Sequence, residues 1–105
     1  MRKFFMTNIY SAGTGFKILE TTRRSQSASM TLEAGESSSE RPNTHPESDQ
    51  VLIVLEGKLI AEISGKRSEM KKGDAVTVPA GTPHRFTNAG NERAVTFSVY
   101  SPPAY

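Results

Sequence analysis

Two histidines are the side chains of this sequence whose type and surroundings could support chemistry. His45 and His84 lie far apart in the chain, in stretches rich in Pro and polar residues at 43–51 and 79–86. Each stretch leads from an expected loop into an expected strand. Neutral imidazole is the commonest side-chain metal ligand in proteins. A fold that brings both rings together would therefore create a metal-binding pocket.

The loop before His84 is built to aim that side chain. Pro79 ends a strand, Gly81 permits a backbone conformation closed to other residues, and Pro83 stiffens the approach. Alternation from His84 then sends Phe86 to the same face of the next strand. An apolar wall beside the imidazole favours its neutral form, which is the form that a metal requires.

The segments that position these histidines are predicted to be short strands, and the sequence shows no long helical periodicity. Turn signals such as Ser64-Gly65 and Lys72-Gly73-Asp74 separate them. Many short strands at near-regular spacing predict an all-β sandwich or barrel. The polar stretch at 34–44 is expected to be a loop. The expected strands cover residues 16–22, 27–33, 51–55, 58–63, 66–70, 75–78, 84–88 and 93–100. The expected core consists of Met30, Leu52, Val54, Val76, Val78, Phe86 and Phe97.

The second histidine stretch resembles a known family pattern. Gly73, the run Pro79-Ala80-Gly81, His84 and Asn88 stand at the spacings of the second cupin motif. Residues 43–57 resemble the first cupin motif in altered form, and the resemblance covers roughly residues 30–100. The sequence is similar to small single-domain cupins of the cupin_2 type. The resemblance implies a double-stranded β-helix, which is a jelly-roll barrel.

The same resemblance implies a set of metal ligands. In the first motif, His45 takes the second histidine position, Gln50 the glutamate position and Asn43 the first histidine position. By carry-over, His45, Gln50 and His84 are expected to hold a divalent transition metal (Ni, Fe, Mn, Zn or Cu), with Asn43 as a fourth ligand. All these ligands are neutral, so a bound metal would keep its full charge and act as a stronger Lewis acid. Glu47 is an alternative source of a carboxylate.

Length and composition set the organisation. The chain has 105 residues, enough for one domain, and we expect an N-terminal arm at 1–15 and a cupin domain at 16–105. Residues 3–6 of the arm could add a strand to a neighbouring subunit. Hydrophobic residues make up 35% of the chain, which is lean for a monomer and predicts a homodimer.

Several function classes are disfavoured. The basic residues come in short pairs without interleaved aromatics, so we expect no nucleic-acid partner. No segment approaches the roughly 20 apolar residues that span a bilayer, so we expect no membrane partner. The chain contains no cysteine, which agrees with a reducing cytoplasm, and we expect a cytoplasmic protein. Arg85 and Tyr100 could contact a substrate, but outward-facing surface positions are favoured for both.

Three hypotheses about function stay open. In the first, the metal binds a small polar molecule, such as a sugar, uronate or keto acid, as in an isomerase-, lyase- or dioxygenase-type enzyme. In the second, the domain is a non-catalytic sensing or binding cupin with a degenerate, metal-free pocket. In the third, it is a dimeric scaffold whose pocket is vestigial. A metal assay separates the first hypothesis from the second.

Overall fold

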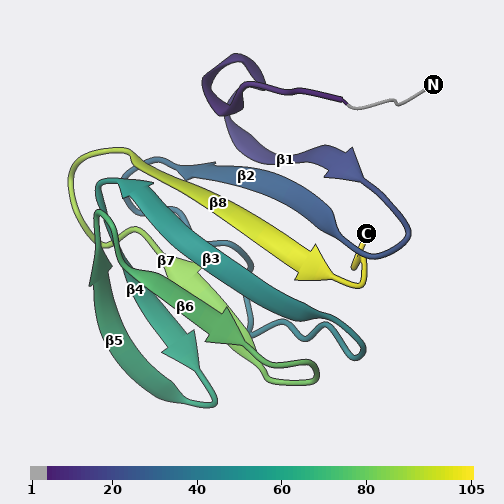
Figure 1. Ribbon diagram of the computed structural model, residues 1–105. Helices are drawn as coiled ribbons and strands as arrows, with labels where there is room; N and C mark the ends of the chain where they lie inside the picture. Colours follow the sequence, from purple (N-terminus) through teal and green to yellow (C-terminus); the bar gives the residue numbers. More distant parts are fainter. Residues whose placement is uncertain (1–4) are drawn as a thin grey trace.

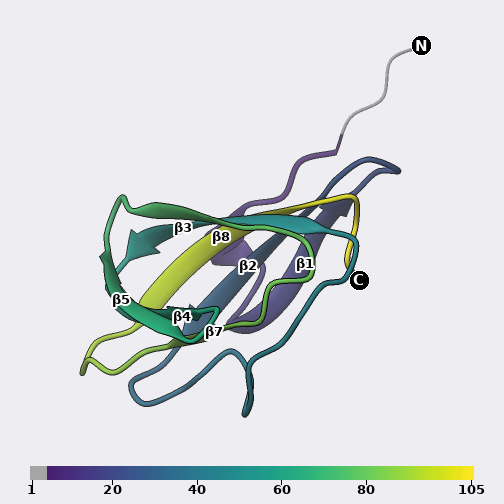
Figure 2. The same cartoon turned by 90° about the horizontal axis from the view of Figure 1, so that it is seen from below.

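The computed structural model describes residues 5–105, which form two antiparallel β-sheets that face each other (Figures 1 and 2). Within this range the helical content is one 3-10 turn, η1 (Ile9–Ser11). The strands are β1 (Gly15–Thr21), β2 (Gln26–Leu32), β3 (Asp49–Glu56), β4 (Lys58–Ile63), β5 (Lys66–Lys71), β6 (Ala75–Val78), β7 (His84–Thr87) and β8 (Ala94–Ser101). The prediction of an all-β jelly roll is confirmed, and each expected strand is present within a few residues of its predicted bounds.

The larger sheet places the last strand at its centre. Its order is β1-β2-β8-β3-β6, so β8 lies between two strands that come much earlier in the chain (Figure 1). The register pairs Tyr100 with both Gln26 and Gln50, and it pairs Ser98 with both Ala28 and Leu52. Directly opposed residues share a face of a sheet. The inward face therefore carries polar side chains at one end and apolar ones further along.

The smaller sheet, β5-β4-β7, is extended by a segment that the sequence predicts to be a loop. Residues 34–44 contain no named strand, yet they run beside β7 through isolated bridges at Ser37 and Asn43. The Ser38 amide donates to the Phe86 carbonyl at 2.8 Å. The Arg85 guanidinium donates to the Ser39 carbonyl at 2.9 Å. This segment thereby covers the edge of β7 that would otherwise stay unpaired.

The core lies between the two sheets. Leu52, Val54, Val78 and Phe86 are buried there as predicted, and Met30 and Val76 pack against them partly buried. The prediction was wrong for Phe97. Its register partners are Ser29 and Ile53, which places it on the face opposite to Ser98, outside the core cluster.

The N-terminal segment was predicted to be an arm, and β1 begins at Gly15, next to that boundary. The side chain of Asn8 caps η1 by accepting from the backbone amides of Tyr10 and Ser11 at 2.9 and 3.2 Å. Lys3 and Phe4, part of the expected swapped strand, lie outside the described residues. Phe5 and Met6 belong to no strand and are 77% and 85% exposed. Strand exchange with a neighbour stays a prediction.

Across residues 5–105, no helix has the length and apolar character needed to cross a membrane.

Candidate functional site

His84 is positioned by its backbone and by its own ring. It opens β7 directly after the loop that contains Gly81, whose φ of +79° lies in the left-handed region. Its backbone exchanges two hydrogen bonds with Asn43, at 2.8 and 2.9 Å. Its Nδ1 lies 2.9 Å from the Thr82 carbonyl. Because a carbonyl only accepts, Nδ1 carries the proton in the neutral ring, which leaves the Nε2 lone pair free.

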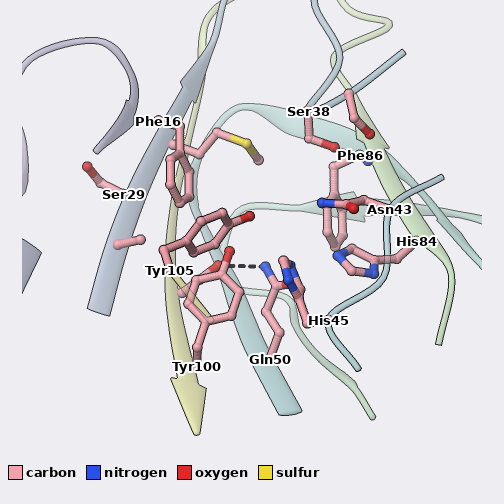
Figure 3. A pocket seen from close by; sticks show the side chains of 14 residues that line it. Phe16, Ser29, Ser38, Asn43, His45, Gln50, His84, Phe86, Tyr100 and Tyr105 are labelled. Atoms are coloured by element: carbon pink, nitrogen blue, oxygen red, sulfur yellow. Dashed lines mark hydrogen bonds between the residues drawn. The ribbon is translucent and has the colours of Figure 1, made fainter. Parts of the chain in front are cut away.

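His45 approaches the same point from the other loop. It lies before β3, and its carbonyl accepts from the Gly81 amide at 2.8 Å, which ties the two histidine loops together. The ring centroids of His45 and His84 are 5.1 Å apart at an interplanar angle of 45°. The two residues are 8% and 5% exposed. The structure therefore brings both imidazoles into one pocket (Figure 3).

Gln50 supplies an amide to this pocket from β3. It is 4% exposed, and its Nε2 donates to the Ser98 hydroxyl at 3.2 Å, the contact drawn dashed in Figure 3. Within the described part of the chain, its Oε1 is buried and has no hydrogen-bond partner. A buried acceptor costs free energy unless a ligand, an ion or a water molecule completes it.

The other two sequence candidates differ in their placement. Asn43 lines the same pocket from its rim, but its Oδ1 accepts from the Thr44 amide at 2.9 Å. Glu47 is exposed and is not among the residues that line the pocket. The structure thus brings together His45, Gln50, His84 and Asn43 and leaves Glu47 outside.

The pocket has a volume of about 200 Å³. Among the described residues, its lining contains no Asp, Glu, Lys or Arg. Its polar groups are imidazoles, amides and hydroxyls, and the rest of the wall is apolar. The lining consists of Phe16, Ala28, Ser29, Met30, Ser38, Ser39, Asn43, His45, Gln50, His84, Phe86, Ser98, Tyr100 and Tyr105.

Three aromatic side chains of the pocket were missed or misplaced by sequence reasoning. Tyr100 was expected to face outward, but it is 3% exposed and its ring meets that of His45 edge-on at 5.1 Å. Tyr105 follows the prolines after β8, and its ring lies 5.3 Å from His45. Phe16 packs against Tyr105 at 4.9 Å. The aligned alternation of β3 and β8 is the signal that could have placed Tyr100 beside Gln50.

The surroundings favour the uncharged forms of His45, Tyr100 and Tyr105. Burial, and then repulsion from His84, lowers the pKa of His45 below its ordinary value. Burial is also the main cause that raises the pKa of Tyr100 and of Tyr105, so both hydroxyls keep their protons. The site therefore offers neutral nitrogen and oxygen donors together with two phenolic hydroxyls.

The lowered pKa of His45 predicts how stability depends on pH. Above the ordinary histidine pKa of about 6.5, the ring is neutral in both the folded and the unfolded chain. As the pH falls through this value, the unfolded chain takes up the proton first, so the free energy of unfolding should decrease. Urea unfolding of chelator-treated protein between about pH 7.5 and pH 5.5 measures this slope. The variant His45→Gln should flatten it, and an unchanged slope in that variant would contradict the assignment.

Comparisons with known proteins agree with this fold. The family model described as "Cupin domain" matches residues 28–100. A solved Bacillus halodurans protein, BH2720, superposes with a TM-score of 0.86 at 27% identity, covering 98% of this chain and 84% of that one. A sugar phosphate isomerase of the cupin superfamily from Silicibacter pomeroyi gives a TM-score of 0.69 at 28% identity, covering 76% of this chain and 52% of that one.

Curated relatives match over shorter stretches. The tetracenomycin polyketide synthase protein TcmJ of Streptomyces glaucescens is 36% identical over 69 residues, which is 65% of this chain and 45% of that protein. The chain spans less than half the length of this relative, so the likeness concerns a domain. The family match includes both histidine loops and the strands that carry Gln50, Phe86 and Tyr100. This chain therefore belongs to the cupin domain family.

Proposed function

We propose that this domain binds one divalent transition metal through His45, His84 and Gln50, with Asn43 at the rim as a fourth ligand, and that the metal holds a small oxygen-bearing molecule. Within residues 5–105, no group of three or more His, Cys, Asp or Glu side chains could hold a metal. The proposed site therefore depends on amide oxygens beside the two imidazoles. Such mixed nitrogen and oxygen donors suit several first-row metals.

The observation that carries the proposal is the buried Oε1 of Gln50. It lacks a hydrogen-bond partner in the described chain, and it lines the same pocket as two imidazole rings whose centroids are 5.1 Å apart. The Ser98 hydroxyl accepts from Nε2 and thereby holds the amide in one orientation. A cation beside Oε1 would satisfy this oxygen and offset the cost of its burial.

The tautomer of His84 supports the same proposal. Donation from its Nδ1 to the Thr82 carbonyl leaves Nε2 as the free nitrogen and limits rotation of the ring. A backbone carbonyl is a frequent partner of metal-binding histidines, because it fixes both the tautomer and the orientation. Burial lowers the pKa of His45, which favours the neutral form of that ring at pH 7.

The chemistry of the site would follow from its charge. With neutral ligands only, a divalent metal held by His45, His84 and Gln50 would keep its full positive charge and would supply Lewis-acid polarisation of an oxygen of the bound molecule. The phenolic hydroxyls of Tyr100 and Tyr105 remain protonated at neutral pH and can donate hydrogen bonds to the bound molecule. Apolar side chains of the wall, among them the buried Phe86 and the partly buried Met30, would surround the rest of the bound molecule.

Metal stoichiometry tests the proposal. Protein purified without a histidine tag is stripped with chelator, incubated separately with Ni, Fe, Mn, Zn and Cu, desalted and measured by elemental analysis. We expect close to one ion per chain for at least one of these metals. Stoichiometry near zero for all of them would contradict the proposal.

Changing Gln50 to a carboxylate should strengthen metal binding. In Gln50→Glu, an anionic oxygen replaces the neutral amide oxygen, so we expect metal affinity to rise about tenfold or more. The stripped variant should unfold more easily than the wild type, because its buried carboxylate has no cation partner. Calorimetric metal titration and urea unfolding measure the two effects. Unchanged affinity in this variant would place the metal away from Gln50.

A second candidate function is binding of a small molecule without metal and without catalysis. The aromatic part of the pocket, with Phe16, Tyr100 and Tyr105, favours it because these rings can hold a ligand by themselves. Ligand binding that is unaffected by exhaustive chelation would select this candidate.

We also propose a homodimer in solution. The lean core supports it, as do exposed apolar side chains on the outer face of the larger sheet, where Val51 is 44% exposed. On this face Val51 is paired with Val99 of β8. Light scattering measures the mass, and a monomer at micromolar concentration would contradict the dimer.

A further inference from the structure

We infer that the molecule held in this pocket is a flat hydroxylated aromatic ring, whose two neighbouring oxygens face His45, His84 and Gln50. The inference rests on the proposed metal for the oxygens and on the opposite wall of the pocket for the ring. Figure 3 shows the two unlike sides, with Phe16, Tyr100 and Tyr105 across from His84 and Asn43.

The aromatic wall is continuous although its members come from three parts of the chain. Phe16 belongs to β1, Tyr100 belongs to β8, and Tyr105 follows β8. The ring centroid of Tyr105 lies 4.9 Å from that of Phe16 and 5.4 Å from that of Tyr100. Aromatic rings attract one another in tilted and edge-to-face arrangements beyond the effect of buried area alone. A planar ligand ring can add to this wall, whereas a puckered sugar ring lacks the π face.

Gln26 is the residue that positions Tyr105 in this wall. Its Oε1 accepts from the backbone amides of Ala104 and Tyr105 at 3.1 and 2.9 Å, and its Nε2 donates to the Tyr105 carbonyl at 3.0 Å. Gln26 itself is only 3% exposed. One buried amide thus holds the segment after β8 against the pocket.

The lack of charged side chains among the described residues of the pocket lining favours an uncharged ligand. Sugar phosphates and uronates carry phosphate or carboxylate groups, which proteins usually pair with Arg or Lys. In the described part of the chain, neither residue lines the pocket, so the proposed metal would be the sole positive charge facing such a ligand. A phenol carries no formal charge in water and leaves no charged group unpaired in the apolar part of the pocket.

The size of the pocket limits the ligand to a single ring. The cavity measures about 200 Å³. A protein cavity of about 150 Å³ is known to hold benzene, so the space here fits one six-membered ring with small substituents.

Two chelators that differ in their ring test the inference. Catechol and acetohydroxamate both bind metals through two neighbouring oxygens, but catechol alone carries an aromatic ring. Both are titrated by calorimetry into zinc-loaded, desalted protein, and galacturonate serves as the sugar-acid probe. We expect catechol to bind more tightly than galacturonate.

Variants of the wall supply the decisive comparison. Phe16 and Tyr105 are 41% and 58% exposed, so the double variant Phe16→Ala/Tyr105→Ala should keep its core. It should bind catechol about tenfold more weakly, lose less affinity for acetohydroxamate and keep its affinity for zinc, because acetohydroxamate loses only the hydroxyl of Tyr105 whereas catechol also loses the ring contacts. Gln26→Leu should shift catechol binding in the same direction. Tyr10→Ala removes an exposed tyrosine outside this pocket and should leave the affinity for both chelators unchanged.

Three results would each overturn the inference. The double variant could lose the same affinity for both chelators, it could lose no affinity for catechol, or the wild type could bind galacturonate more tightly than catechol. If the wild type takes up another of the five metals but no zinc, that metal replaces zinc in these titrations. If it takes up none of them, the proposed metal site fails separately. Catechol is then titrated into the metal-free protein, where it must still bind more weakly to the double variant than to the wild type for the aromatic assignment to stand.

Discussion

The double variant His45→Ala/His84→Ala is expected to lose metal binding while keeping its fold. Removing both imidazoles leaves the proposed site only the amide oxygens of Gln50 and Asn43, and Asn43 Oδ1 already accepts from a backbone amide. Loss of a residue that merely supports a metal ligand costs about 10- to 100-fold in affinity, so loss of two direct ligands should exceed about 100-fold. Calorimetric titration with the metal that the wild type takes up measures the change.

The fold should survive this change because the histidines lie at the edge of the hydrophobic cluster. That cluster includes Leu52, Val54 and Phe86 but neither histidine. Circular dichroism and urea unfolding check the fold of each variant. Glu47→Gln is the matched control, since Glu47 lies near His45 in the chain but outside the pocket, and its removal should leave metal affinity unchanged. Metal binding retained by a folded double variant would refute the proposed ligands.

Gly57→Ala is expected to be among the most destabilising single substitutions in this chain. Gly57 joins β3 to β4 with a φ of +75°, where an alanine costs about 1–2 kcal/mol. A Cβ at this position would also lie 2.5 Å from the Arg93 carbonyl oxygen and 2.9 Å from the Ala94 Cα. These are backbone atoms next to the fully buried Ala94, so relief requires the start of β8 to move. Such overpacking adds about 1–3 kcal/mol.

Gly65→Ala separates the cost of the positive φ from the cost of overpacking. Gly65 has nearly the same φ, +77°, but apart from Gly65 and its two chain neighbours no atom of the described residues lies within 4 Å of its added Cβ. This variant should therefore lose only the conformational part, and Gly57→Ala should lose about 1–3 kcal/mol more. Urea unfolding of both variants measures the difference. Since a domain of this size has about 5–15 kcal/mol of stability in total, the loss is readily detected, and equal losses would contradict the close approach of β8.

The strand and turn pattern could be predicted from the sequence because it is local. Alternating apolar residues mark each strand, and turn residues such as those of Ser64-Gly65 mark where the chain reverses. The loop before His84 was also predictable, because Pro and Gly act on their own backbone. Its resemblance to a cupin motif then indicated that His45 would lie close by, and the two rings do share a pocket.

Which face of β8 points toward the pocket could not be predicted from the sequence. Along this strand the apolar residues Val95, Phe97 and Val99 alternate with the more polar residues Thr96, Ser98 and Tyr100. Hydrophobicity alone favours the first set as core, which agrees with the predictions that Phe97 lies in the core and that Tyr100 faces outward. The register with β2 and β3 instead turns Ser98 and Tyr100 inward, so the more polar face of β8 lines the pocket.

The sequence by itself determined the order of strands and turns and one rigid histidine loop, because these depend on residues that are neighbours in the chain. Only the tertiary structure decided that Gln50 lines the same pocket as both imidazoles, with an Oε1 that has no partner among residues 5–105. It also decided that Gln26 holds Tyr105 in the aromatic wall. Those contacts join residues far apart in the chain, and their geometry follows from sheet register and from where the segment after β8 packs. Neither is encoded in any local pattern.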